Sequence, residues 1–70
     1  MTIKITGNEL GQSSISIYST AGHLAYRREF MKTTTLQLEK IDMSGMQAGV
    51  YVVVVQITDT IRIRKVILKQ

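Results

Sequence analysis

The sequence Asp-Met-Ser-Gly-Met-Gln-Ala-Gly-Val-Tyr-Val-Val-Val-Val-Gln-Ile occupies residues 42–57 and decides the fold. Its first half is typical of a compact turn. The side chains of Asp42 and Ser44 can bond nearby backbone N–H groups, and Gly45 and Gly49 can take positive φ. Its second half is the strongest strand signal in the chain, because Val and Tyr suit a pleated sheet. The run therefore predicts a turn that leads into the central strand of a sheet.

Both faces of this central strand are apolar, which predicts that other strands surround it. Alternation places Val52 and Val54 on one face, and Val53 and Val55 on the other. We expect the core to contain Val52, Val54, Ile15, Ile17 and Leu36.

The rest of the chain reads as short strands joined by short turns. No segment shows helical periodicity over ten residues, and Ser19–His23 and Thr58–Thr60 are typical of hairpin turns, with Gly22 at positive φ. The other strands are expected at Thr2–Ile5, Ser14–Tyr18, Leu24–Phe30, Thr34–Leu38 and Ile61–Leu68. This spacing predicts an all-β antiparallel sandwich or barrel with almost no helix.

Two strands carry further expectations about side-chain direction. Leu36 and Leu38 are expected to point inward. Leu24, Tyr26 and Phe30 should share a face that Arg28 interrupts. Either a bulge shifts the register there, or the aliphatic stem of Arg28 lies along the core edge.

Size and composition indicate one small domain, residues 1–70, with marginal stability. The apolar share of 44% is enough for a core, and the absence of Cys excludes disulfides and thiolate metal sites. The absence of Pro leaves the sheet edges without a common guard, so a homodimer through open strand edges is a hypothesis. No apolar run is long enough for a membrane helix and no signal peptide opens the chain, so we expect a fragment of a longer precursor and no membrane insertion.

The net charge of +4 is concentrated at the C-terminal end, after the last acid at Asp59. Arg62, Arg64, Lys65 and Lys69 make a basic cluster that can bind nucleic acid, although a solvated strand face is the simpler interpretation. Single-strand binding needs exposed aromatic side chains for base stacking. The aromatic residues Tyr18, Tyr26, Phe30 and Tyr51 all fall where core residues are expected, so no nucleic-acid partner is predicted.

Catalytic constellations are missing from the sequence. The single His, His23, falls in a predicted turn, and a metal site needs three or four ligands. The serines have no other base that could activate them, and no Gly-Lys-Ser/Thr follows Gly49 to form a phosphate loop. Met43 and Met46 are expected to plug the end of the core. We predict neither an enzyme nor a cofactor or metal site.

Three segments together resemble the C-terminal sorting domain of cargo proteins of the type IX secretion system of Bacteroidetes-type bacteria. Ile15–Leu24 is similar to the family's hairpin with Ile-Tyr before the turn and Gly-basic-apolar after it, with His23 at the basic position. Asp42–Tyr51 is similar to its Asp-Leu-Ser-x-Leu-x-x-Gly-x-Tyr turn, and Lys65–Lys69 to its terminal Lys-apolar-apolar-apolar-Lys strand. The Tyr-Pro-Asn-Pro segment that often opens such domains is absent, and the chain ends in Gln70 rather than Lys.

The resemblance implies an immunoglobulin-like sandwich of about six to seven short strands that acts as a secretion signal. It further implies that the cargo passes through the periplasm, that the type IX translocon recognises the domain, and that a sortase-like cysteine peptidase removes the domain by cutting upstream of this chain. The same resemblance implies that the cargo then stays on the outer membrane at the cell surface or is secreted. The residues expected to be recognised are Gly49, Tyr51, Lys65, Val66, Ile67, Leu68 and Lys69. An immunoglobulin-like adhesin or protein-interaction module, or a small basic nucleic-acid-binding β-barrel, remains an alternative.

Overall fold

The computed structural model describes residues 1–70 as six antiparallel β-strands without a helix. Short turns join most of them, and a longer turn joins β4 to β5. The strands are β1 (Thr2–Thr6), β2 (Gly11–Ser19), β3 (Leu24–Lys32), β4 (Leu36–Lys40), β5 (Gly49–Ile57) and β6 (Ile61–Lys69). The predicted all-β antiparallel sandwich is confirmed, with strand bounds that differ by a few residues from those expected.

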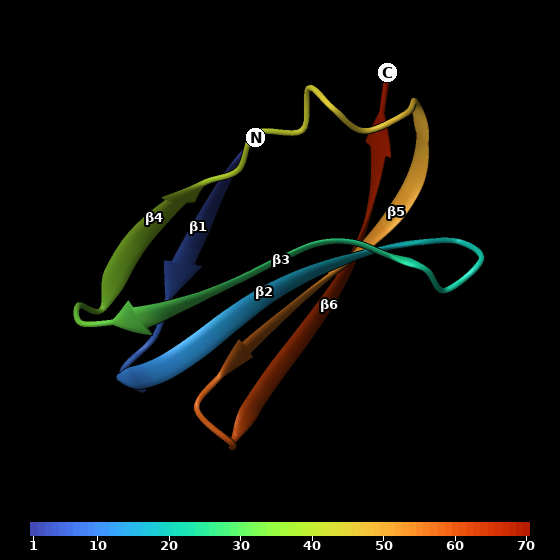
Figure 1. Ribbon diagram of the computed structural model, residues 1–70. Coiled ribbons are helices and arrows are strands. Elements are labelled where there is room, and N and C mark those ends of the chain that lie inside the picture. The colour runs from blue at the N-terminus through green and yellow to red at the C-terminus, as the bar shows by residue number, and fades with distance from the viewer.

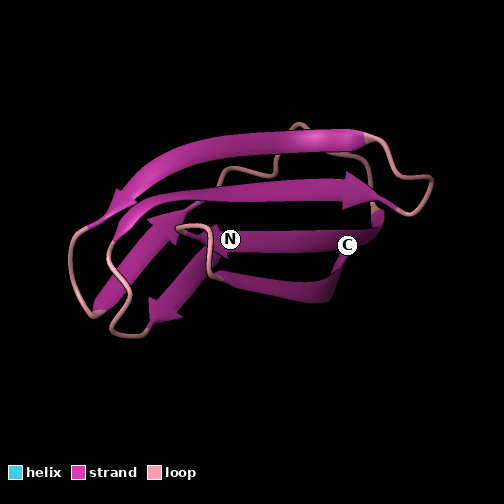
Figure 2. Ribbon diagram, turned by 90° about the horizontal axis from the view of Figure 1, so that it is seen from below, coloured by secondary structure: helices cyan, strands magenta, loops and turns pink.

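The strands form two layers of unequal size (Figures 1 and 2). The larger sheet has the order β3-β2-β5-β6, and the smaller sheet pairs only β1 with β4. Figure 1 shows the two short strands lying over β2 and β3, away from β6. The smaller sheet is therefore too narrow to cover the whole inner face of the larger one.

The core lies between the two sheets and is built mainly from β2 and β5. Ile15 and Ile17 have no solvent exposure, as the alternation of β2 predicts. The other buried members of the cluster are Ile5, Phe30, Ile41, Tyr51, Val53, Val55 and Ile57. Burial of these apolar side chains is the main stabilising term available to a small chain without disulfides.

The prediction that Val52 and Val54 belong to this core is wrong. Val53 lies opposite Ile17 in the register of β5 with β2, so the odd-numbered residues of β5 face inward. Val54 is nevertheless buried, because on the outer face it lies between Ser16 of β2 and the long side chain of Arg64 on β6. Strands β2 and β6 flank β5 within the sheet, but the outer face has no second layer, so the prediction that both faces of β5 are covered is wrong.

The prediction that Leu36 and Leu38 point inward is wrong as well. Their side chains are 52% and 58% exposed, and Gln37 and Glu39 face the interior instead. Strand β4 begins two residues later than expected, and its pairing with β1 places Gln37 opposite the buried Ile5. Because side chains alternate across a strand, this register reverses both faces of β4.

Strand β3 resolves the two alternatives for Arg28. Arg28 pairs with Ile15 without a register shift, and its guanidinium donates a hydrogen bond to the Lys40 carbonyl at 3.1 Å. The irregularity lies further along the ladder, between Ile17 and Tyr18, and it turns Leu24 onto the outer face, where it is 53% exposed. Arg28 therefore spans the edge between the sheets, and the expectation that Leu24 shares a face with Tyr26 and Phe30 is wrong.

Candidate recognition surface

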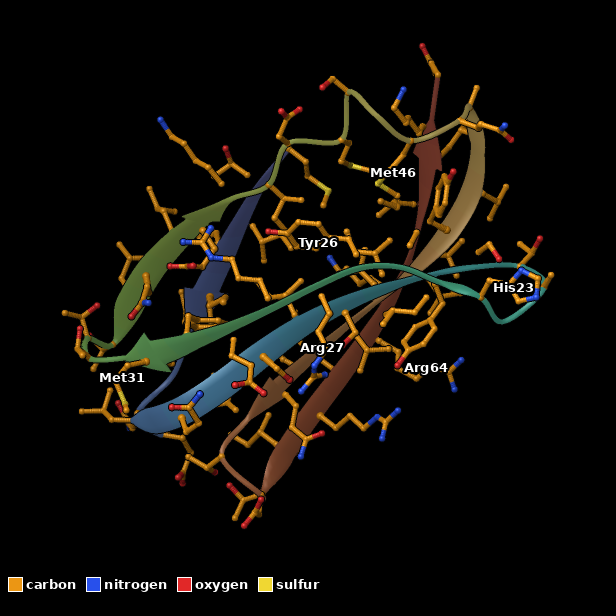
Figure 3. The ribbon with its side chains drawn as sticks, in the orientation of Figure 1. His23, Tyr26, Arg27, Met31, Met46 and Arg64 are labelled. Carbon is orange, nitrogen blue, oxygen red and sulfur yellow. The ribbon has the colours of Figure 1, made fainter.

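The turn before β5 is held by its own polar groups. The Ser44 backbone N–H donates to Asp42 Oδ1 at 2.9 Å, and hydrogen bonds from the Ser44 hydroxyl and N–H lower the pKa of Asp42 below its ordinary value. Met43 and Met46 pack against the core, as predicted, and Figure 3 shows Met46 beneath the turn. The turn is thus an ordered plug at one end of the sandwich.

Tyr51 ties this turn to β5. Its hydroxyl donates a hydrogen bond to the Gln47 carbonyl at 2.6 Å, and its ring is buried in the core. A buried Tyr that satisfies its hydroxyl in this way fixes the chain around it. The structure therefore gives Tyr51 a supporting position beneath the surface.

Gly49 begins β5 with φ at +150°, in a region that side-chain-bearing residues avoid. A Cβ added there would meet no atom within 4 Å. Its requirement is therefore one of backbone conformation, and not of close approach. Gly45, in contrast, does not take positive φ.

The C-terminal strand β6 divides its residues between two environments. Lys65 and Ile67 lie on the inner side, opposite Val53 and Tyr51 of β5. Val66 and Leu68 lie on the outer side and are 72% and 65% exposed. The exposed apolar side chains of β6 are therefore available for contact, whereas Ile67 packs against the core.

The structure brings the predicted recognition residues together at one end of the larger sheet. Gly49 pairs with Lys69, and Tyr51 pairs with Ile67. Lys65 is the member that lies furthest along β6 from this pairing. Strand β6 is also an edge strand, so its outer main-chain groups have no partner strand.

Two of the predicted recognition residues, Val66 and Leu68, belong to an apolar group whose other members the sequence did not single out. Val50 pairs with Leu68, and Val52 pairs with Val66, on the open face of the larger sheet. We call these four residues the outer apolar patch. The alternation of β5 places Val50 and Val52 on one face, but the same alternation also predicts that this face is a second core face.

Buried charged and amide side chains of β3 and β4 find their partners within the molecule, in main-chain carbonyls or in one another. Lys32 is almost completely buried, and its Nζ donates to the carbonyls of Gly7 and Thr34, each at 2.7 Å. Gln37 bonds the buried carboxylate of Glu39, whose other oxygen lies 3.6 Å from the Arg28 guanidinium. Sequence patterns do not reveal such pairings, because each depends on how the two sheets meet.

His23 lies exposed in the turn between β2 and β3, at one end of the molecule (Figure 3). Its carbonyl accepts a hydrogen bond from the Ser19 backbone N–H at 2.8 Å, and its backbone N–H donates to the Ser19 hydroxyl oxygen at 3.2 Å. No group of three or more His, Asp or Glu side chains lies close enough together to hold a metal ion. Of the aromatic residues, Phe30 and Tyr51 are buried, whereas Tyr18 lies on the outer face opposite Val52.

None of the secondary structure could form a helical membrane span, because no sufficiently long apolar helix is present.

The fold and its exposed edge define a small all-β module whose distinctive features are the Gly49 turn and the C-terminal strand. A family model described as "Secretion system C-terminal sorting domain" matches residues 1–69. The chain therefore belongs to the family of type IX secretion C-terminal sorting domains. Neither the curated proteins nor the solved structures gave a significant match.

Membership of this family defines the general role of the chain. Domains of this family are sorting signals, in general non-catalytic, that interact with the type IX secretion system. Such a signal directs export across the outer membrane, to the cell surface or into the medium.

Proposed function

We propose that residues 1–70 form one sorting domain of a longer precursor, and that the translocon recognises it through β6 and the turn that precedes β5. The observation that carries this proposal is the pairing of Gly49 and Tyr51 with the last residues of β6. This pairing joins the family's turn and terminal-strand motifs into one surface. An ordered edge strand offers a receptor both backbone groups and alternate side chains.

Within this surface the residues have different roles. Gly49 and Tyr51 hold the turn and the strand in place, and Ile67 anchors β6 to the core. Val66 and Leu68 supply exposed apolar contacts on the outer face. The ammonium groups of Lys65 and Lys69 contribute to the encounter rate and to discrimination between partners more than to affinity.

A reporter protein carrying the domain tests these roles in a cell that has the type IX system. Replacing Lys65 and Lys69 by Gln removes both charges and keeps much of each aliphatic stem. We expect the fold to survive and more of the reporter to remain in the periplasm. The matched control replaces Arg62 and Arg64 by Gln, which removes two charges from the outward face of the same strand.

The two double variants distinguish a specific signal from general solubility. Retention with the Lys variant alone assigns recognition to Lys65 and Lys69. Export of the Lys variant at the original rate would show that these charges are not part of the signal. Recognition would then lie in the backbone edge of β6 or in the Gly49 turn. Equal retention of both variants indicates that net charge alone matters.

We further propose that the cargo passes through the periplasm and that a sortase-like cysteine peptidase then removes the domain. Its cleavage site is expected upstream of Met1, and the peptidase leaves the cargo attached to the cell surface. The family assignment supports this proposal only at the level of type IX export. A cell whose peptidase lacks its cysteine should carry cargo with the domain still attached, and normal release in that cell would contradict the proposal.

Pairing of two copies is proposed through the free edge of β3 rather than through the edges of β1 or β6. Strand β3 carries both signs of charge, with Arg27 and Glu29 forming an ion pair at 3.1 Å. Edges β1 and β6 carry cations only, which repel their counterparts in a second copy. Light scattering that gives the monomer mass at all concentrations would contradict this dimer.

A further inference from the structure

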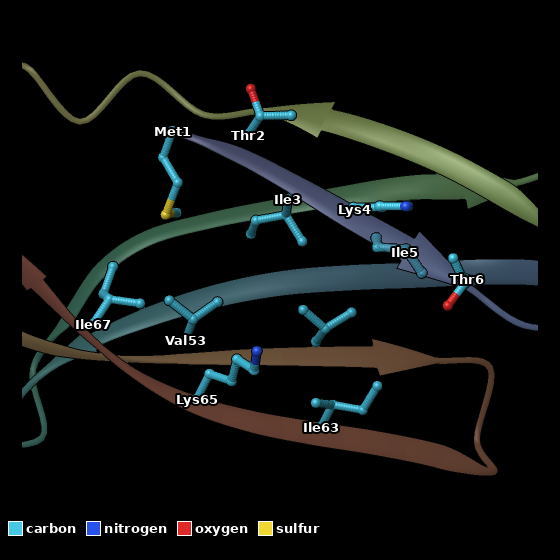
Figure 4. A pocket seen from close by; sticks show the side chains of 11 residues that line it. Met1, Thr2, Ile3, Lys4, Ile5, Thr6, Val53, Ile63, Lys65 and Ile67 are labelled. Carbon is cyan, nitrogen blue, oxygen red and sulfur yellow. The ribbon is translucent and has the colours of Figure 1, made fainter.

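A groove separates β1 of the smaller sheet from β6 of the larger one (Figure 4). Its volume is about 440 Å³. Strand β1 forms one wall, Ile63, Lys65 and Ile67 of β6 form the other, and Val53 and Val55 of β5 form the floor. Ile63 is 45% exposed here because the smaller sheet does not reach β6.

The wall formed by β1 carries unpaired main-chain groups. Met1 and Ile41 exchange two backbone hydrogen bonds, at 2.8 and 2.7 Å, so this pair is hydrogen-bonded across β1 and β4. Hydrogen-bonded and non-hydrogen-bonded pairs alternate in an antiparallel ladder. The N–H and C=O groups of Thr2, Lys4 and Thr6 therefore point to the free edge of β1.

The groove is positively charged as well as apolar. Lys4 and Lys65 line it, and no Asp or Glu does. In Figure 4 the side chain of Lys65 rises from β6 toward the space above Val53. A second copy that paired β1 with β1 would bring two sets of these lysines together, which disfavours that occupant.

We propose that this groove binds an extended segment of another protein, in which apolar residues alternate with others and one carboxylate faces Lys65. Main-chain pairing with Thr2, Lys4 and Thr6 would add a third strand to the smaller sheet. The inner residues of β6 recur at every second position as Ile63, Lys65 and Ile67. The segment therefore needs an apolar, an acidic and an apolar residue at its own alternate positions.

The groove lies on the inner side of β6 and shares Lys65 with the proposed recognition surface, but the observations that support it do not rest on the proposed function. It is tested with the purified chain in the absence of any export apparatus. The probe is the peptide acetyl-Thr-Ile-Thr-Glu-Thr-Ile-Thr-amide, whose Ile, Glu and Ile side chains share one face of a strand. The matched probe has Lys in place of Glu.

Amide signals of the isotope-labelled chain report where each probe binds. We expect the Glu probe to shift the signals of Thr2, Lys4 and Thr6 and to slow exchange of their amide hydrogens. A single partly exposed ion pair should make the Glu probe bind about fivefold more tightly than the Lys probe. Shifts confined to β3 or to the outer face, or no binding of the Glu probe at millimolar concentration, would overturn the proposal.

Charge reversal within the chain gives the second arm. Lys65→Glu should reverse the preference between the two probes, whereas Arg64→Glu, on the opposite face of the same strand, should preserve it. Equal effects of the two substitutions would assign the preference to net charge and overturn a groove site.

Two further measurements test the other occupants. Protection of the β1 amides that rises with protein concentration would show that a second copy fills the groove. Protection of the same amides in the precursor, together with failure of the precursor to bind the Glu probe, would show that the groove is covered within one chain. Either result would overturn the proposal that the groove binds a segment of another protein.

Discussion

Substituting Gly49 by Ala isolates the conformational requirement of the turn before β5. The φ of +150° lies in a region that costs other residues on the order of 1–3 kcal/mol. The open space around the missing Cβ adds no steric term. We therefore expect the free energy of unfolding to fall by about 1–3 kcal/mol, and the melting temperature of a domain of this size by about 4–8 °C for each kcal/mol.

Urea unfolding followed by far-ultraviolet circular dichroism measures this change, with an unchanged slope expected. Gly45→Ala is the matched control in the same turn. Gly45 does not take positive φ and a Cβ there meets nothing within 4 Å, so stability should stay equal or rise by up to about 1 kcal/mol. Gly49→Val should cost at least as much as Gly49→Ala, because a β-branched side chain tolerates positive φ less well than a methyl group does, although the space is open. An unchanged midpoint for Gly49→Ala, or a clearly smaller loss for Val than for Ala, would refute this reasoning.

Three further predictions concern the packing and the polar contacts, and urea unfolding of the substituted proteins tests each of them. Ile17→Ala should cost about 2–5 kcal/mol because Ile17 is fully buried, whereas Leu36→Ala should change stability by less than about 0.5 kcal/mol; equal losses would contradict the observed faces of β4. Lys32→Met should cost about 1–3 kcal/mol because the carbonyls of Gly7 and Thr34 lose the buried Lys32 ammonium as their donor, and Lys40→Met at an exposed position should cost little. The lowered pKa of Asp42 means that its carboxylate stabilises the fold at pH above its ordinary value of 3.8, and that this contribution is lost as the pH falls through the folded-state value. The stability difference between the wild type and Asp42→Asn should therefore shrink in acid, and a difference that grows there would contradict the assignment.

The sequence was sufficient to predict the fold class, because β-branched runs and turn residues are local signals. The clean alternation of Ile15 and Ile17 predicted their burial, and Gly22 takes the positive φ expected of its hairpin. Asp42 and Tyr51 lie in the turn and strand that the motif predicted.

The errors came from residues whose surroundings are set by long-range pairing. Val52 and Val54 belong to a strand with two apolar faces, and only the register with β2 decides which face is covered. Leu36 and Leu38 point outward because Gln37 and Glu39 find polar partners inside, and strand periodicity cannot distinguish these outcomes. The groove was also beyond prediction from the sequence, since it depends on the width of the smaller sheet.

Export of a reporter measures the central claim most directly. A periplasmic reporter is fused in front of residues 1–70 and produced in two strains, one with a working type IX translocon and one without it. The sorting role predicts reporter on the cell surface or in the medium only in the first strain, with retention in the periplasm of the second. Retention in both strains, or escape from both, would contradict the claim that this domain is a type IX sorting signal.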